Sequence, residues 1–168
     1  MLLIVWDMDR MEMLWKIECH DDKVFALEWS PDSNYVITGG KDNTAKVWHI
    51  VDERPVSIFL DHAAPIYCAK WAPNGRLVAT GSGDSTVRIW NPNTGEGLIT
   101  LTVKEGPVHS ICWDQTGNKL ISGSEDGSVR LWKLVVEKEK LVAIAKSRIV
   151  KSLTEKERSD FGLLKEFN

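Results

Sequence analysis

Residues 81–90 read "GSGDSTVRIW", and this stretch decides the fold because it recurs at a constant spacing. Moving back 42 residues from Trp90 gives "GGKDNTAKVW", which ends at Trp48, and moving forward 42 gives "GSEDGSVRLW", which ends at Trp132. A phosphate-binding loop would need a lysine–hydroxyl pair and a helix after its glycines. Residues 86–90 instead alternate in polarity and contain β-branched side chains, which is typical of a strand. The glycine-rich part is therefore interpreted as a turn between strands.

The same 42-residue step also links a second tryptophan series, Trp29, Trp71 and Trp113, and reaches back from Trp48 to Trp6. Each period predicts four short strands, which in the second copy are residues 66–71, 77–80, 86–90 and 98–102. Asp-Asn, Asp-Ser and Asp-Gly at positions 42–43, 84–85 and 126–127 predict two-residue hairpin turns, because these residue types tolerate a positive φ. A period of about 40–45 residues with a tryptophan near its end is typical of a propeller blade.

Composition indicates a globular, soluble domain, with 43% hydrophobic residues and a net charge of −3. No basic stripe is present, so nucleic-acid binding is not expected. The N-terminus lacks the basic segment of a signal peptide, and no apolar run reaches membrane-spanning length, so a cytoplasmic protein without membrane association is expected. Three cysteines without any Cys-x-x-Cys pair (Cys19, Cys68 and Cys112) are expected to be buried free thiols, with no metal site and no cofactor.

The repeats resemble those of the WD40-repeat (G-protein β-type) propeller family, over residues 1 to about 143. The resemblance implies an all-β fold, namely a partial, open WD40 β-propeller of about three full four-stranded blades with a fragment of another and a short C-terminal α-helical tail. The expected divisions are a partial blade at 1–18, repeats at about 19–60, 61–102 and 103–143, and the tail at 144–168. In the tryptophan series that ends each copy, the Trp-Asp dipeptide survives only at Trp6 and Asp7, and the other members read Trp48-His49, Trp90-Asn91 and Trp132-Lys133.

The resemblance also implies a buried hydrogen-bonded tetrad in each blade, made by a tryptophan, a serine or threonine, a histidine and an aspartate. The residues that match are His20, Thr38, Asp42 and Trp48; His62, Thr80, Asp84 and Trp90; and, in the third copy, Ser122, Asp126 and Trp132. Lys104 stands where the third histidine should be, so this blade is expected to be less rigid. A general-base role for the histidines is disfavoured because the pattern recurs in register and no nucleophile accompanies it, and no catalytic residue is expected. His49 and His109 are interpreted as isolated surface or packing residues.

In the same family, loops at one end of the blades carry the protein-binding surface. The positions in these loops that would meet a ligand are Asp22, Lys23, Lys41, Ala64, Pro65, Gly83, Gly106, Pro107 and Glu125. Large aromatic anchors, the usual energetic centres of interfaces, are scarce in these loops.

The tail carries a charge of +2, whereas residues 1–134 carry −5. Apolar residues at helical spacing predict a helix from about Ala143, and Thr154 with Glu157 forms a capping box for a second helix that ends near Gly162. Residues 138–144 are left open, because Lys140–Ile144 alternatively forms the outer strand of the last blade. The tail also resembles the end of bacterial WD40 proteins, including signalling ATPases of the NACHT type.

We therefore expect a non-enzymatic protein-interaction scaffold, or alternatively the C-terminal sensor part of a larger NTP-dependent, NACHT-type signalling protein. Too few blades are present to close a ring, and open ends expose strand edges and apolar faces. Three solutions remain open at this point. The chain associates with itself or with a protein partner to complete the propeller, the tail covers one end, or the sequence belongs to a longer polypeptide.

Overall fold

The computed structural model describes residues 1–52 and 54–134, and in this part of the chain every regular element is a β-strand. The strands in chain order are β1 (Leu2–Asp7), β2 (Glu12–Glu18), β3 (Val24–Trp29), β4 (Tyr35–Gly40), β5 (Ala45–His49), β6 (Pro55–Phe59), β7 (Ile66–Trp71), β8 (Val78–Ser82), β9 (Thr86–Trp90), β10 (Gly97–Thr102), β11 (Val108–Trp113), β12 (Lys119–Ser124) and β13 (Val129–Lys133). The predicted all-β fold is confirmed for these residues.

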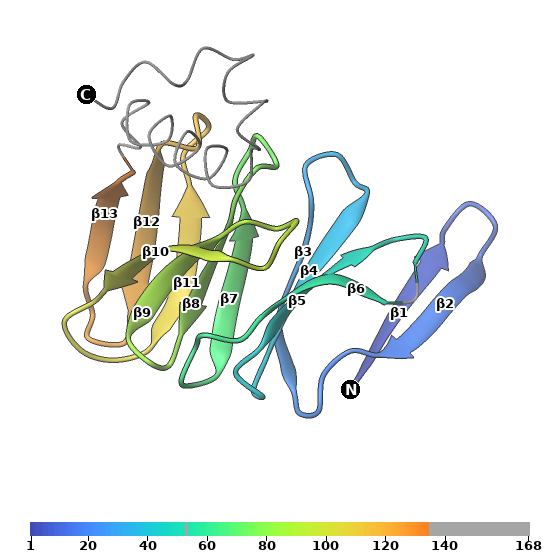
Figure 1. Cartoon of the computed structure of the whole chain (residues 1–168), viewed down its shortest axis with the longest axis horizontal. Helices are drawn as coiled ribbons and strands as arrows, with labels where there is room; N and C mark the ends of the chain where they lie inside the picture. Colours follow the sequence, from blue (N-terminus) through green and yellow to red (C-terminus); the bar gives the residue numbers. More distant parts are fainter. Residues whose placement is uncertain (53, 135–168) are drawn as a thin grey trace, which may run out of the picture. The chain divides into compact units, whose positions relative to one another are not determined.

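The strands form four antiparallel sheets that follow one another along the chain (Figure 1). Two sheets have four strands each, β3–β6 and β7–β10, in which every strand pairs with its neighbours in the sequence. The strands β11–β13 form a three-stranded sheet, and β1 pairs with β2 alone. A sheet built as a meander of four short strands is the propeller-blade arrangement that the 42-residue period predicts.

The incomplete sheets can be aligned with the complete ones by this period. β13 is equivalent to β5 and β9, so β11–β13 are the first three strands of a blade, and β1 and β2 are the third and fourth strands of another. The expected partial blade at residues 1–18 is thus the outer half of a blade. The expected last outer strand at 138–144 and the expected helical tail at 144–168 lie outside the described residues.

Neighbouring sheets pack through their first strands, so that β3, β7 and β11 lie side by side. Glycines in the second strand of each sheet make this close approach possible. A Cβ atom added to Gly39 would lie 2.7 Å from Cγ2 of Ile66 in the next sheet, and one added to Gly81 would lie 2.7 Å from Cγ1 of Val108. Ile66 and Val108 are fully buried, which makes this contact the centre of each interface between sheets.

The hairpin turns differ from the prediction of two-residue loops. Gly40 donates its N–H to the carbonyl of Thr44, and the backbone between them is a three-residue loop in which Asn43 has a φ of +67°. Ser85 and Gly127 take the same place, with φ values of +64° and +77°. The aspartate before each of them keeps a negative φ, because its carboxylate turns back to accept from the backbone of the loop.

Candidate functional site

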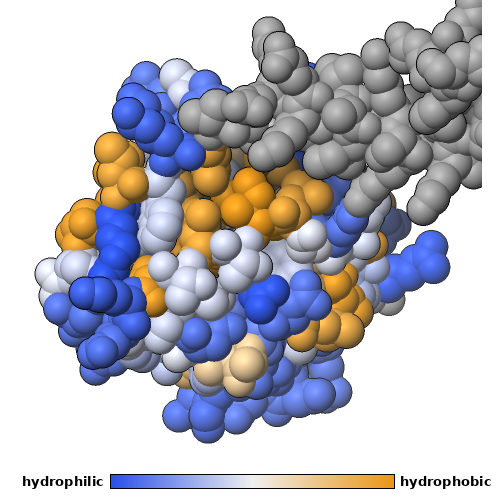
Figure 2. Space-filling model, turned by 60° about the vertical axis from the view of Figure 1, so that its left-hand side comes forward, coloured by the Kyte–Doolittle hydropathy of each residue, from blue (hydrophilic) through white to orange (hydrophobic). Residues whose placement is uncertain are grey.

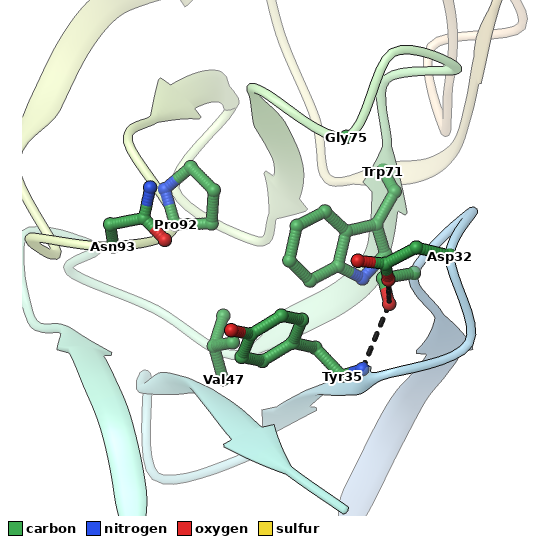
Figure 3. Close-up of a pocket in the computed structure, with 8 residues that line it drawn as sticks. Asp32, Tyr35, Val47, Trp71, Gly75, Pro92 and Asn93 are labelled. Atoms are coloured by element: carbon green, nitrogen blue, oxygen red, sulfur yellow. Dashed lines mark hydrogen bonds between the residues drawn. The ribbon is translucent and has the colours of Figure 1, made fainter.

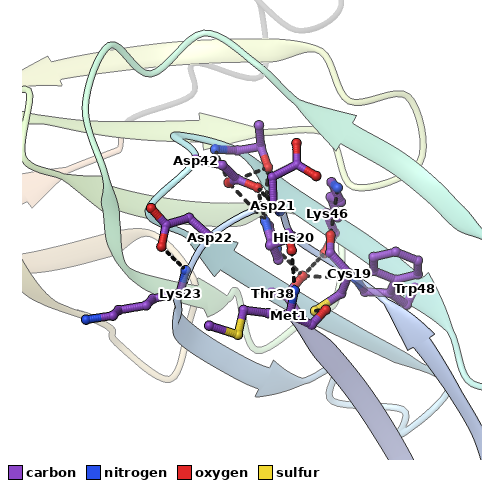
Figure 4. Close-up of polar contacts among 11 residues, drawn as sticks. Met1, Cys19, His20, Asp21, Asp22, Lys23, Thr38, Asp42, Lys46 and Trp48 are labelled. Carbon is purple, nitrogen blue, oxygen red and sulfur yellow. Dashed lines mark hydrogen bonds and ion pairs between the residues drawn. The ribbon is translucent and has the colours of Figure 1, made fainter.

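In the β3–β6 sheet, four predicted residues form one continuous hydrogen-bonded chain (Figure 4). The carboxylate of Asp42 lies 2.9 Å from Nδ1 of His20, and Nε2 of the same ring lies 2.8 Å from the hydroxyl oxygen of Thr38. The indole N–H of Trp48 donates to this hydroxyl at 2.9 Å. A carboxylate only accepts, so His20 donates from Nδ1 and its Nε2 accepts from Thr38. Every group in the chain is thus satisfied when the histidine is neutral.

The β7–β10 sheet repeats this arrangement with His62, Thr80, Asp84 and Trp90. The corresponding distances are 2.7 Å from His62 Nδ1 to the carboxylate, 2.8 Å from His62 Nε2 to the threonine oxygen, and 2.7 Å from the indole nitrogen to that oxygen. Trp90 is fully buried and its ring stacks at 4.8 Å on Phe59, which belongs to the last strand of the preceding sheet. The tetrad therefore joins the strands of one sheet, and its tryptophan joins two sheets.

Burial governs the proton equilibria of both histidines. It lowers the pKa of His20 and of His62 below the usual value, although Asp42 and Asp84 oppose this shift through hydrogen bonds and charge. Burial raises the pKa of each aspartate, but hydrogen bonds from the following threonine and from the histidine outweigh it and hold that pKa below its usual value. Each buried neutral imidazole is held between a carboxylate and a threonine hydroxyl, and Thr38 and Thr80, which carry these hydroxyls, are fully buried. The arrangement therefore links strands and loops within a sheet and presents no accessible hydroxyl to a substrate.

The third copy departs from this arrangement at its histidine. Trp132 donates to Ser122 at 2.9 Å, but Lys104 is exposed and Asp126 instead accepts a hydrogen bond from Arg130 at 2.8 Å. The hydrogen bonds of Ser128 and Arg130 lower the pKa of Asp126 to about 2. Arg130 was missed in the sequence, although its position, four residues after an aspartate that lacks its histidine, was the available signal.

The predicted binding loops lie together at one end of the sheets, and we call this surface the loop rim. It comprises residues 19–23, 60–65 and 103–107, which precede the first strands, and residues 41–44, 83–85 and 125–128, which form the hairpins. Neighbouring loops are linked by equivalent bonds. The N–H groups of Lys41, Gly83 and Glu125 donate to the carbonyls of Lys23, Pro65 and Pro107, at distances of 2.8, 2.9 and 2.9 Å.

The other predicted rim residues are also placed by local contacts. Asp22 is half-buried and forms an ion pair with Lys41 at 3.2 Å, and Ala64 accepts from Ser82. Gly106 has a φ of +82° and packs against the loop of Glu125. The nine residues therefore share one surface, and their role in binding stays a prediction.

A row of aromatic rings lies beside the loop rim and was not found in the sequence. Phe25, Tyr67 and His109 occupy equivalent positions in β3, β7 and β11, with ring centroids 5.5 Å and 5.0 Å apart. A Cβ atom on Gly83 would lie 3.3 Å from the Tyr67 ring, and His109 lies 3.6 Å from Glu125, so the row adjoins the hairpin loops. The interpretation of His109 as isolated was wrong, and the 42-residue step between these positions was the missed signal.

His49 was also wrongly interpreted as isolated, since it packs on Tyr35 at 5.1 Å and lies 3.4 Å from Asp52. Near it, at the opposite end of the sheets, Tyr35 and Trp71 line a small cavity (Figure 3). Its volume of about 50 Å³ suits one or two water molecules and is too small for a peptide or cofactor. The buried indole N–H of Trp71 has no partner in the described residues, which a water molecule in this cavity would satisfy.

The cysteines differ from the expectation of three buried thiols. Cys19 is buried, Cys68 is half-buried with its pKa raised to about 12 by burial, and Cys112 is exposed on β11. Within residues 1–52 and 54–134, no group of histidine, cysteine and carboxylate side chains has the geometry to hold a metal ion. In the same residues, no helix has the length and apolarity that spanning a membrane requires.

Four-strand meanders in series, joined by glycine-mediated contacts and locked by buried tetrads, define the class of β-propeller repeat proteins. The chain belongs to the WD40 family, because the family model described as "WD domain, G-beta repeat" matches residues 11–49, 53–91 and 95–133. Each matched segment contains the last strand of one sheet and the first three strands of the next. The recognition of this family in the sequence is confirmed.

Curated relatives are similar over short segments. The chain is 38% identical over 47 residues to "Periodic tryptophan protein 2 homolog" of Mus musculus, covering 28% of this chain and 5% of that protein. It is 35% identical over 51 residues to "Protein FIZZY-RELATED 1" of Arabidopsis thaliana, covering 30% and 11%, and 38% identical over 42 residues to "WD repeat-containing protein 1" of Gallus gallus, covering 25% and 7%. The chain thus matches about a tenth or less of each of these relatives. Similarity to WD-repeat proteins supports a protein-interaction role and indicates no catalytic family.

Proposed function

We propose that the chain is a non-enzymatic scaffold that binds a protein partner through the loop rim and the adjoining aromatic row. The observation that carries this proposal is the alignment of Phe25, Tyr67 and His109, since aromatic side chains beside adaptable loops are the usual centres of protein interfaces. The tetrads beneath the rim hold it rigid, which lowers the entropic cost of binding.

A displayed library of random peptides, selected on the immobilised chain, provides a probe for this surface. We expect selected peptides to bind Tyr67→Ala at least tenfold more weakly than the unchanged protein, as for a central aromatic contact. Arg76→Ala serves as the control, because Arg76 is exposed in the loop between β7 and β8 at the opposite end of the sheets. Peptides that bind Tyr67→Ala and the unchanged protein equally well would refute binding through the aromatic row.

The alternative function is that of the C-terminal sensor part of a larger NTP-dependent signalling protein of the NACHT type. Its motivation is the sequence of the tail, which lies outside the described residues. The parent gene distinguishes the two proposals, because the alternative requires further blades and a phosphate-binding loop encoded upstream of Met1.

The location and the partners complete the proposal. We propose a cytoplasmic protein, consistent with three cysteines that form no disulfide, and partners that are proteins, including a second copy of this chain. Cell fractionation of the tagged chain tests the location.

A further inference from the structure

The sheet β11–β13 presents an exposed apolar face, whereas the equivalent face is buried in the β3–β6 and β7–β10 sheets. In the two complete sheets, the equivalent positions are fully buried, as Ala79, Val87 and Ile89 of the β7–β10 sheet are at 0% exposure. In the last sheet these positions are Ile121, Val129 and Leu131, which are 45%, 75% and 58% exposed. Figure 2, which turns this end forward, shows apolar side chains gathered there. The sheet therefore carries the side chains of an interface whose partner is not among the described residues.

Gly123 marks the centre of this face. In the equivalent positions, Gly39 and Gly81 receive the side chains of Ile66 and Val108 from the next sheet. Among residues 1–52 and 54–134, a Cβ atom on Gly123 would have only Ser110 within 4 Å, at 3.9 Å. The face thus retains a place for a branched aliphatic side chain, which no described residue fills.

The first strand of the series presents the complementary surface. Val24 of β3 is the residue equivalent to Ile66 and Val108, and it adjoins a groove of about 310 Å³. Leu27 and Trp29 are 60% and 50% exposed, whereas their equivalents Ala69 and Trp71 are buried against the preceding sheet. The chain therefore carries both halves of its own sheet-to-sheet interface, one at each end.

β1 occupies the position that β13 of a preceding sheet would take. Leu3 and Val5 are equivalent to Val129 and Leu131, but they are buried in a cluster with Trp48 of the next sheet. The hairpin lacks the two inner strands of a blade, so β1 leaves the face of β3 open.

We propose that a second copy of this chain covers the apolar face of β11–β13, with Val24 of its β3 seated against Gly123 and its β2 paired to β13. In this arrangement β13 replaces β1 beside β2, so that Val129 and Leu131 take the places of Leu3 and Val5. Each copy offers one face of each kind, so a two-fold pair closes both ends. The proposal goes beyond binding at the loop rim and does not depend on it.

Light scattering after size-exclusion chromatography measures this pairing. We expect the unchanged chain, at tens of micromolar, to have twice the 19.0 kDa mass of one chain. Gly123→Val should halve the measured mass, because the added side chain fills the place of Val24, whereas in the single chain no described residue comes closer than 3.9 Å to an added Cβ. Val129→Lys should do the same, whereas Val51→Lys, at a residue 73% exposed in the turn after β5, should leave the pair intact.

A reversible lock tests the displacement of β1. Ile4 and Lys16 lie opposite each other in the β1–β2 pair, so Ile4→Cys with Lys16→Cys can join the two strands by a disulfide. Cys112→Ser in the same variant removes the exposed thiol that would cross-link copies. We expect the oxidised variant to be a single chain and the reduced variant to pair.

Three results would overturn the proposal. A single-chain mass for the unchanged protein would show that a second copy does not cover the apolar face of β11–β13. A pair that persists in Val129→Lys uses another surface, and a pair that persists when β1 is locked forms without the exchange. If circular dichroism shows that Gly123→Val is unfolded, Val129→Lys and the lock decide the question. None of these results changes the peptide-binding test at Tyr67.

Discussion

Replacing Trp90 by phenylalanine isolates the energetic role of the tetrad. The substitution keeps a ring that can stack on Phe59 but removes the N–H that donates to Thr80 at 2.7 Å in a fully buried site. Loss of a buried hydrogen bond of this kind costs about 1–3 kcal/mol. The smaller ring also leaves a void, which adds about 1 kcal/mol if about 40 Å³ stays empty. The free energy of unfolding should therefore fall by about 2–4 kcal/mol.

The matched substitution is Trp132→Phe, since Trp132 is half-buried and its tetrad lacks the histidine. We expect a loss of about 1 kcal/mol, because water can replace part of the bond to Ser122. Urea unfolding followed by circular dichroism gives both values, with unchanged denaturant slopes as the check that only stability has changed. Equal losses for the two variants would show that the histidine-containing chain contributes nothing beyond an ordinary buried tryptophan.

Three further predictions concern the tetrads and the contacts between neighbouring sheets. Burial lowers the pKa of His20 and His62, so the folded chain binds fewer protons than the unfolded one, and the free energy of unfolding should decrease as the pH falls below about 6.5; unfolding at several pH values measures this slope, which should flatten in His62→Gln. Gly81→Ala should destabilise the protein by about 1–3 kcal/mol in urea unfolding, because its Cβ would lie 2.6 Å from the sulfur of Cys68 and 2.7 Å from Val108, whereas Gly83→Ala, with 3.3 Å contacts, should cost less. Arg130→Met should raise the pKa of Asp126 from about 2 toward its usual value, as measured by carboxyl carbon chemical shifts, and an unchanged pKa would mean that Ser128 alone holds the carboxylate.

The period of the sequence was sufficient to predict the strands, because each blade repeats the same burial demands at a 42-residue step. The strand Thr86–Trp90 was predicted with its bounds, and the residues proposed for two tetrads lie within hydrogen-bonding distance of one another. A tryptophan and a histidine that recur at the same positions of two repeats leave few alternative hydrogen-bonding arrangements, since their buried polar atoms need partners.

Contacts between residues of different repeats were harder to predict from the sequence. The row of Phe25, Tyr67 and His109 mixes three residue types, so no letter recurs to reveal it. The predicted hairpin length was wrong because Asp42 and Asn43 are compatible with both a two-residue and a three-residue loop. The hydrogen bond between His20 and the carboxylate of Asp42 favours the three-residue loop. The exposure of Cys112 depends on the absence of a following sheet among the described residues, which its own strand does not encode.

Each repeat that the family model recognises supplies the outer strand of one sheet and the three inner strands of the next. Duplication or loss of one 42-residue unit in a gene would therefore change the number of four-stranded sheets by one and leave the number of strands in every remaining sheet unchanged. The peptide chain would still cross from each sheet to the following one through the same outer strand. A new unit would meet its neighbours through a glycine and a branched aliphatic residue, as Gly81 meets Val108. Such an architecture can change length in evolution without inventing a new interface.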